Sequence, residues 1–216
     1  MPVTEHLTQL KEHIGSDQIL TDKDSLDNYG KDWTKHLTPS PSAIVFPKST
    51  EEVQAIVKWA RANKISLIPS GGRTGLSGAA TAMNNEVVVS MEKMNQILDF
   101  SSIDMTVQCQ AGVITEQLQN YAADKDLFYP VDFAARGSSH IAGNIATNAG
   151  GIKVVRYGLT RDWVAGLTVV TGTGEVLKLN NGLVKNATGF DLRHLIIGSE
   201  GTLGFITEAT MRLTTP

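Results

Sequence analysis

The chain of 216 residues has a single cysteine, little net charge and no long apolar run. Cys109 has no partner for an internal disulfide, which suits a reducing compartment, and we therefore expect a cytoplasmic protein. A net charge of −3 gives no electrostatic basis for binding nucleic acid or an anionic membrane surface. No segment is long and apolar enough to span a membrane. The first residues include Glu5, Lys11 and Glu12, so they make a poor secretory signal.

The common phosphate and metal motifs are also missing. A Walker loop needs lysine and then serine or threonine after its last glycine, but Gly78 is followed by Ala79 and Ala80. No GxGxxG occurs, which excludes the usual dinucleotide fingerprint. The sequence has no HExxH and no paired CxxC, so we predict no metal site.

Two glycine-rich stretches are the main positive signal. Residues 69–78 read PSGGRTGLSG, and residues 137–151 read GSSHIAGNIATNAGG. Glycine allows positive φ and a close approach to the backbone, and successive inward-pointing N–H groups can hold anionic oxygens. Two such stretches in one chain indicate a large phosphorylated cofactor. The alternatives are a tight turn without ligand for the first stretch, and a helix cap followed by a glycine stop for the second.

The first half of the chain predicts a small α/β layer. A strand at 43–47 precedes a helix that starts at Ser49, where Glu52 completes a capping-box pattern. A buried strand at 65–68 runs into the first glycine-rich stretch, and another strand follows at 86–90. Residues 1–42 are expected to form an N-terminal helix and a lead-in that is irregular from residue 22 onward.

The second half predicts an antiparallel sheet with helices on one side. Gly172-Thr173-Gly174 is typical of a hairpin turn, and Ser138 or Ser139 is expected to cap a short helix that ends near Asn148. We expect an α+β protein with two lobes, 43–100 and 101–216, whose glycine-rich stretches face a common cleft. The remaining elements expected are strands at 106–110, 163–171, 176–179 and 203–213, the last of them bulged, and helices at 115–124 and 191–197.

Four segments, in order, resemble a known family. They are PSGGRTGLSGAAT, DFAARGSSHIAGNIATNAGG, VRYGLTRDWVAGLTVVTGTGEVL and ATGFDLRHLIIGSEGTLGFITEATMRL. Together they resemble the PCMH-type FAD-binding domain of the vanillyl-alcohol oxidase superfamily. The branch most similar contains the FAD-linked 2-hydroxyacid dehydrogenases: D-lactate dehydrogenase, D-2-hydroxyglutarate dehydrogenase and the glycolate oxidase FAD subunit. The resemblance implies two α+β subdomains with FAD in the cleft between them.

The resemblance also implies which residues bind the cofactor. FAD is expected to be non-covalent, because Arg73 stands where covalent members carry histidine and Cys109 lies outside the loops that form cysteinyl links. Phe190 and Phe133 depart from the family pattern, which has tyrosine at the first position and proline or a small residue at the second. The residues implied are, around the pyrophosphate, Pro69, Gly71, Gly72, Arg73, Thr74, Gly75, Leu76 and Ser77; along the middle of the cofactor, Asp132, Gly137, Ser138, Gly143, Asn144 and Thr147; and near it, Glu200, Gly201 and Ile206.

The activity implied is oxidation of a small 2-hydroxy acid by hydride transfer to FAD. Family members continue into a substrate (cap) domain that supplies the catalytic base and any metal, so we expect this chain to be the FAD-binding half of such an enzyme. Whether it is a fragment or a natural short protein stays open, and an isolated half is expected to self-associate through its uncovered face. A second hypothesis is a non-catalytic FAD-binding subunit that needs a partner chain. A third is another enzyme on the same fold, such as a peptidoglycan-precursor reductase or a sugar oxidase, which GNIATNAGG and VRYGLTRDWV disfavour.

Several further residues have two interpretations. His140 either touches the flavin or substrate or is a structural histidine, and Trp33 in the Asp32-Trp33 pair either packs or approaches the cofactor. Arg156 and Tyr157 either approach the flavin or hold the loop after Gly151 in place. Cys109, with no activating neighbour in sequence, is expected to be a small core residue.

Overall fold

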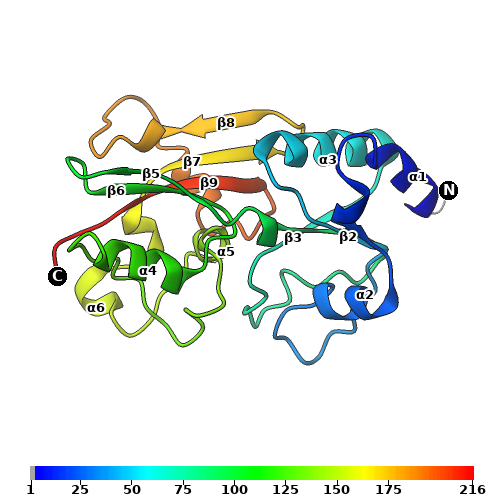
Figure 1. Cartoon of the computed structure of the whole chain (residues 1–216), viewed down its shortest axis with the longest axis horizontal. Helices are drawn as coiled ribbons and strands as arrows, with labels where there is room; N and C mark the ends of the chain where they lie inside the picture. The colour runs from blue at the N-terminus through cyan, green and yellow to red at the C-terminus, as the bar shows by residue number, and fades with distance from the viewer. Residues whose placement is uncertain (1–2) are drawn as a thin grey trace.

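A computed structural model describes residues 3–216 and shows two sheets joined side by side (Figure 1). The helices are α1 (Val3–Leu10), α2 (Lys23–Tyr29), α3 (Thr50–Asn63), α4 (Thr115–Ala123), α5 (Ile141–Thr147), α6 (Val154–Tyr157) and α7 (Arg193–Ile196). The strands are β1 (Ile19–Leu20), β2 (Ala43–Val45), β3 (Leu67–Ser70), β4 (Val87–Ser90), β5 (Ile97–Ser101), β6 (Thr106–Gln110), β7 (Val164–Thr171), β8 (Val176–Leu179) and β9 (Gly204–Arg212).

The first sheet has the order β1-β2-β4-β3. Strands β2 and β3 both run parallel to β4, and α3 makes the crossover between β2 and β3. Helix α3 starts where the sequence predicts, because the Ser49 side chain accepts a hydrogen bond from the Glu52 N–H at 3.2 Å. The expected strand, helix, strand, loop, strand order is confirmed for this layer.

The lead-in is more regular than the sequence suggested. Helix α2 lies inside the stretch expected to be irregular, and Asp22 caps it by accepting a hydrogen bond from the Ser25 N–H at 2.9 Å. Strand β1 adds antiparallel to the edge of the first sheet. Helix α2 has seven residues and buries none of them, so the sequence carries no clear apolar periodicity there.

The second sheet is antiparallel throughout, with the order β5-β6-β9-β7-β8. Strand β9 is central, and its pairing with β7 contains the irregular register that a bulge produces. Helices α4, α5 and α6 lie on one face of this sheet (Figure 1). The antiparallel sheet, the β7–β8 hairpin and the one-sided helices confirm the prediction for this half. The chain passes from one sheet to the other between Ser90 and Ile97.

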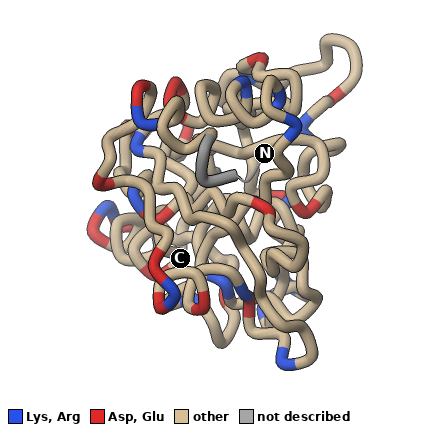
Figure 2. The backbone as a smooth tube through the Cα atoms, turned by 90° about the vertical axis from the view of Figure 1, so that its right-hand side faces the viewer, with Lys and Arg blue, Asp and Glu red and all other residues tan. Residues whose placement is uncertain are grey.

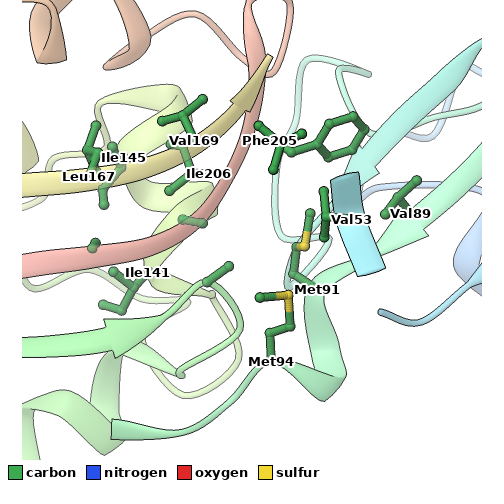
Figure 3. Packing of buried hydrophobic residues seen from close by; sticks show 14 of the residues in the cluster. Val53, Val89, Met91, Met94, Ile141, Ile145, Leu167, Val169, Phe205 and Ile206 are labelled. Carbon is green, nitrogen blue, oxygen red and sulfur yellow. The ribbon is translucent and has the colours of Figure 1, made fainter. Parts of the chain in front are cut away.

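One hydrophobic core joins the two sheets. Figure 3 shows Val53 of α3 and Val89 of β4 in the same cluster as Phe205 and Ile206 of β9. A buried hydrogen bond of 2.9 Å joins the hydroxyls of Thr50 in α3 and Thr207 in β9. Since close-packed cores resist sliding, these contacts fix the relative position of the two lobes.

The lone cysteine belongs to this core. Cys109 is fully buried on β6, and burial raises the pKa of its thiol to about 12. Its interpretation as a small core residue is therefore confirmed. Across residues 3–216, no helix has the length and apolarity needed to cross a bilayer. Basic and acidic residues are interspersed over the face in Figure 2.

Candidate cofactor-binding site

A cleft of about 500 Å³ lies where the two sheets meet. The first glycine-rich stretch, which begins in the last two residues of β3, forms one side of the cleft, and α5 with the start of β9 forms the other. The two stretches singled out in the sequence therefore share one crevice. Of the residues implied by the resemblance, the cleft is lined by Pro69, Gly71, Gly72, Arg73, Thr74, Gly75, Leu76, Ser77, Gly143, Asn144, Thr147, Glu200, Gly201 and Ile206.

Glycines allow the walls of the cleft to approach one another closely. A methyl group on Gly72 would overlap the carbonyl oxygen of Ser138 and lie 2.8 Å from the Cα of Ser139. At Gly201, where φ is +81°, a methyl group would overlap the ring of Pro69. Glycine is therefore required at position 72 by the neighbouring backbone and at position 201 by the Pro69 ring and the positive φ.

The first stretch presents a run of free backbone donors. Within residues 3–216, none of the N–H groups from Gly72 to Ser77 donates a hydrogen bond to a protein acceptor, whereas the next N–H, of Gly78, donates to Asp32 at 2.8 Å. Backbone donors beside a cleft need a partner, and a run of them on a curved loop suits anionic oxygens. The loop thus has the donor set that a diphosphate requires.

Buried polar side-chain atoms in the same walls also lack partners. Ser70 Oγ, Arg73 Nη1 and His140 Nδ1 are inaccessible to solvent and have no hydrogen-bond partner in the described part of the chain. All three residues line the cleft. Unpaired buried polar atoms are uncommon in folded proteins, and their concentration here fits a polar ligand.

Arg73 is held back against the protein. Its φ of +57° is left-handed, which is unusual for a residue other than glycine. Its guanidinium lies 4.4 Å from the centre of the Tyr29 ring, and Nη1 is 3.9 Å from a carboxylate oxygen of Glu92. These contacts brace the loop, while the positive charge stays at the edge of the cleft.

The second stretch places His140 directly before α5. The sequence predicted a cap from Ser138 or Ser139; that was wrong, because His140 occupies the N-cap position and no side chain caps the helix. The Ser139 hydroxyl instead lies 2.7 Å from Thr115 Oγ1, a residue far away in sequence. Asn148 ends α5 in a left-handed conformation, as the predicted boundary requires.

His140 is a neutral imidazole at physiological pH. It is buried, and burial together with the nearby Arg73 lowers its pKa from 6.5 to about 4, against a smaller opposing effect of Glu92. Its Nδ1 has no partner in the described part of the chain and is an acceptor or a donor, depending on the tautomer.

We predict a pH dependence of stability that comes from His140. Unfolded, the imidazole binds a proton near pH 6.5, whereas the folded form resists protonation down to about pH 4. The contribution of the neutral imidazole to the free energy of unfolding is complete above pH 6.5. It is lost as the pH falls toward 4, and the loss is on the order of 3 kcal/mol. Urea unfolding of wild type and His140→Asn across this pH range measures the effect. As the pH falls, wild type should lose more of its free energy of unfolding than the variant does. Parallel profiles would contradict the prediction.

The polar side chains of α5 are used within the protein. Asn144 Nδ2 donates to Thr115 Oγ1 at 2.6 Å, and Thr147 Oγ1 donates to the carbonyl oxygen of Gly143 at 2.9 Å. Gly143 itself faces open space, since a methyl group there would meet no atom outside its own helix within 4 Å. Helix α5 therefore lines the cleft with Gly143, which leaves open space, together with Ala142, Asn144, Ala146 and Thr147.

Three residues implied by the resemblance lie outside the lining of the cleft: Asp132, Gly137 and Ser138. The Asp132 carboxylate is 3.0 Å from both Arg136 Nη1 and Lys153 Nζ. Although burial acts to raise its pKa, the hydrogen bonds from these two cations lower it. Asp132 thus holds the segment before the second glycine-rich stretch rather than facing the crevice.

Other candidates also fall outside the cleft. Trp33 is 68% exposed, and Arg156 lies 4.9 Å from the ring centre of Tyr157; none of the three lines the crevice. The sequence interpretation passed over Asp32, which is buried and does line it. Of the Asp32-Trp33 pair, the aspartate and not the tryptophan lines the cleft.

Comparison with known proteins agrees with this geometry. A family model described as "FAD binding domain" matches residues 41–180. A D-2-hydroxyglutarate dehydrogenase of Stutzerimonas stutzeri (strain A1501) is 66% identical over 207 residues, covering 96% of this chain and 45% of that protein. The mitochondrial D-2-hydroxyglutarate dehydrogenase of Arabidopsis thaliana is 39% identical, covering 97% of this chain and 37% of its own length. The chain thus spans less than half the length of these curated relatives.

Solved structures share the fold. An alkyldihydroxyacetonephosphate synthase superposes with a TM-score of 0.88 at 28% identity, over 98% of this chain and 40% of that one. A p-cresol methylhydroxylase with bound substrate gives 0.83 at 22% identity, over 100% of this chain and 44% of that one, which shows the fold alone. The family model matches well over half of the chain, and together with these relatives it shows that the chain belongs to the FAD binding domain family and that its cofactor is FAD.

Proposed function

We propose that this chain is the FAD-binding portion of a flavin-dependent dehydrogenase that oxidises a 2-hydroxy acid, with D-2-hydroxyglutarate as the first substrate to test. The run of unpaired N–H groups from Gly72 to Ser77 carries the cofactor half of the proposal. The 66% identity to a D-2-hydroxyglutarate dehydrogenase supports the substrate class. D-lactate and glycolate stay in the comparison as the other acids of this type.

In this proposal the chain's own residues position the cofactor. The N–H groups of Gly72–Ser77 hold the diphosphate, and Gly143, which has open space beyond its Cα, leaves room for the cofactor along the cleft. The residues implied by the resemblance that line the cleft are the proposed cofactor contacts, whereas Asp132, Gly137 and Ser138 act behind them. Bound FAD supplies the hydride acceptor.

The groups that recognise the substrate are proposed to come from polypeptide beyond this chain. The ionisable side chains that line the cleft, Asp32, Arg73, His140 and Glu200, include no lysine. Asp32 and Arg73 are engaged in the contacts given above, and the low pKa of His140 makes it a weak base at neutral pH. Ile152, Val155 and Phe190 are almost fully exposed, as expected of a surface that another domain covers.

A second candidate is a non-catalytic FAD-binding subunit that works with a separate chain. The same exposed apolar residues support it, because a partner chain would cover them equally well. Determining whether the reading frame continues past residue 216 separates the two. A continuous frame favours the first proposal, and a stop codon with a co-purifying partner favours the second.

The direct test is an absorption spectrum of the purified protein before and after acid precipitation. Flavin bands that move entirely into the supernatant are expected, because Arg73 replaces the linking histidine and Cys109 is buried away from the cleft. Anaerobic addition of D-2-hydroxyglutarate, D-lactate or glycolate to the longest available protein should bleach the bands, most rapidly with the true substrate. A colourless protein that takes up no added FAD would refute the proposal.

A further inference from the structure

The lead-in segment from Tyr29 to Thr34 lies against the first glycine-rich stretch. The Trp33 N–H donates to the Gly75 carbonyl oxygen at 2.9 Å, and the Ala82 N–H donates to the Gly30 carbonyl oxygen at 2.9 Å. The segment from Tyr29 to Thr34 precedes the part of the chain that the family model matches, which starts at residue 41. The loop is therefore braced by a segment outside the matched domain.

Asp32 is the centre of this brace. Its carboxylate accepts hydrogen bonds from the Gly78 N–H at 2.8 Å, the Thr34 N–H at 2.8 Å and the Thr81 hydroxyl at 3.2 Å. The residue is only 7% exposed, and within residues 3–216 no cationic side chain lies within ion-pair distance of it. A buried carboxylate without a counter-ion is stabilised by its donors, so these three bonds fix its orientation.

One of the groups that donate to Asp32, the Gly78 N–H, lies at the end of the loop. This N–H comes immediately after the run of unpaired N–H groups from Gly72 to Ser77. A methyl group on Gly75 would lie 3.6 Å from Asp32 Oδ2, so the carboxylate also lies close to the middle of the loop. Together with the Tyr29 ring under Arg73, the segment holds the loop at three successive points.

We propose that Asp32 is a positioning residue for FAD, which holds the closing turn of the loop so that the N–H groups of Gly72–Ser77 converge on the cofactor diphosphate. This proposal rests on one part of the proposed function, the binding of FAD, and does not depend on the identity of the substrate. Asp32 itself donates nothing to an anion; it acts by binding the Gly78 N–H and by keeping the loop curved before FAD arrives. Its effect should therefore appear in cofactor affinity beyond any effect on folding.

The test compares three variants at a temperature below all their thermal midpoints. Asp32→Asn turns one acceptor oxygen into a donor, so it should weaken FAD binding about 10- to 100-fold, measured by flavin fluorescence titration of the apoprotein. Thr81→Val removes a hydrogen bond to the same carboxylate but leaves the Gly78 contact, so it should lower the thermal midpoint and change FAD affinity less than about threefold. Asp27→Asn, an exposed position on α2, should change neither.

Hydrogen exchange on the wild-type protein tests the same idea without a variant that must fold. In the apoprotein the Gly78 amide should be protected and the amides of Gly72–Ser77 should exchange freely, becoming protected only when FAD is added. A folded Asp32→Asn variant with wild-type FAD affinity would overturn the role of Asp32 and leave the proposed function untouched. A Thr81→Val variant whose FAD affinity falls as much as that of Asp32→Asn would do the same. A wild-type protein that takes up no FAD would overturn the proposed function as well.

Discussion

Gly72→Ala is expected to lose FAD binding by at least about 100-fold and to lower the free energy of unfolding by about 1–3 kcal/mol. The new methyl group would overlap the Ser138 carbonyl oxygen and crowd the Cα of Ser139. Both neighbours are backbone, so neither can rotate away, and the two glycine-rich stretches must separate. The donor loop and the rest of the cleft would then no longer match one ligand.

Fluorescence titration with FAD and urea unfolding of the apoprotein measure the two effects. Gly172→Ala is the matched control, because a methyl group at that turn between β7 and β8 meets no atom within 4 Å. The control should bind FAD normally and change the free energy of unfolding by no more than about 0.5 kcal/mol. Wild-type FAD affinity in a folded Gly72→Ala protein would show that the close contact of the two stretches is not needed.

Gly143→Leu is expected to separate cofactor binding from folding. The residue lies within α5 and lines the cleft, and the space beyond its Cα is open. Leucine is the better helix former by about 0.5–1 kcal/mol, so the apoprotein should be as stable as wild type or more so. The side chain would fill the volume proposed for FAD, and affinity should fall by at least about 100-fold.

The measurement is again FAD titration with thermal unfolding of the apoprotein, and Gly172→Leu serves as control for adding the same side chain at an open position away from the cleft. If Gly143→Leu kept wild-type affinity, the cofactor would not lie beside α5. If it unfolded instead, the open space at Gly143 would be needed by the fold and not by a ligand.

Much of the fold was predictable because its signals are local. The Ser49 cap with Glu52 marks the start of α3, and the glycine-containing turn at 172–174 marks the hairpin. The composition of the two glycine-rich stretches indicated a large phosphorylated cofactor, the resemblance to a known family implied FAD, and the structure places both stretches in one cleft. Helix α2 was missed because it buries no residue and so leaves no periodic pattern.

The parts of the site that were not predictable depend on contacts between distant residues. Asp32 and Gly78 are 46 positions apart, and Asn144 meets Thr115 across 29. Nothing in the sequence near Asn144 indicates that its side-chain amide donates to a threonine. Similarly, Asp132 looks like a cleft residue until Arg136 and Lys153 are seen to hold its carboxylate.

By itself, the sequence determined where the backbone must curve tightly and expose its N–H groups, because glycine has that property wherever it stands. Only the tertiary structure decided which polar groups remain free for a ligand. The N–H groups of Gly72–Ser77 stay unpaired, whereas the Gly78 N–H donates to Asp32 and the Asn144 side-chain amide donates to Thr115. A hydrogen bond forms only when two partners meet in space, so the same residue types are available in one place and used up in another.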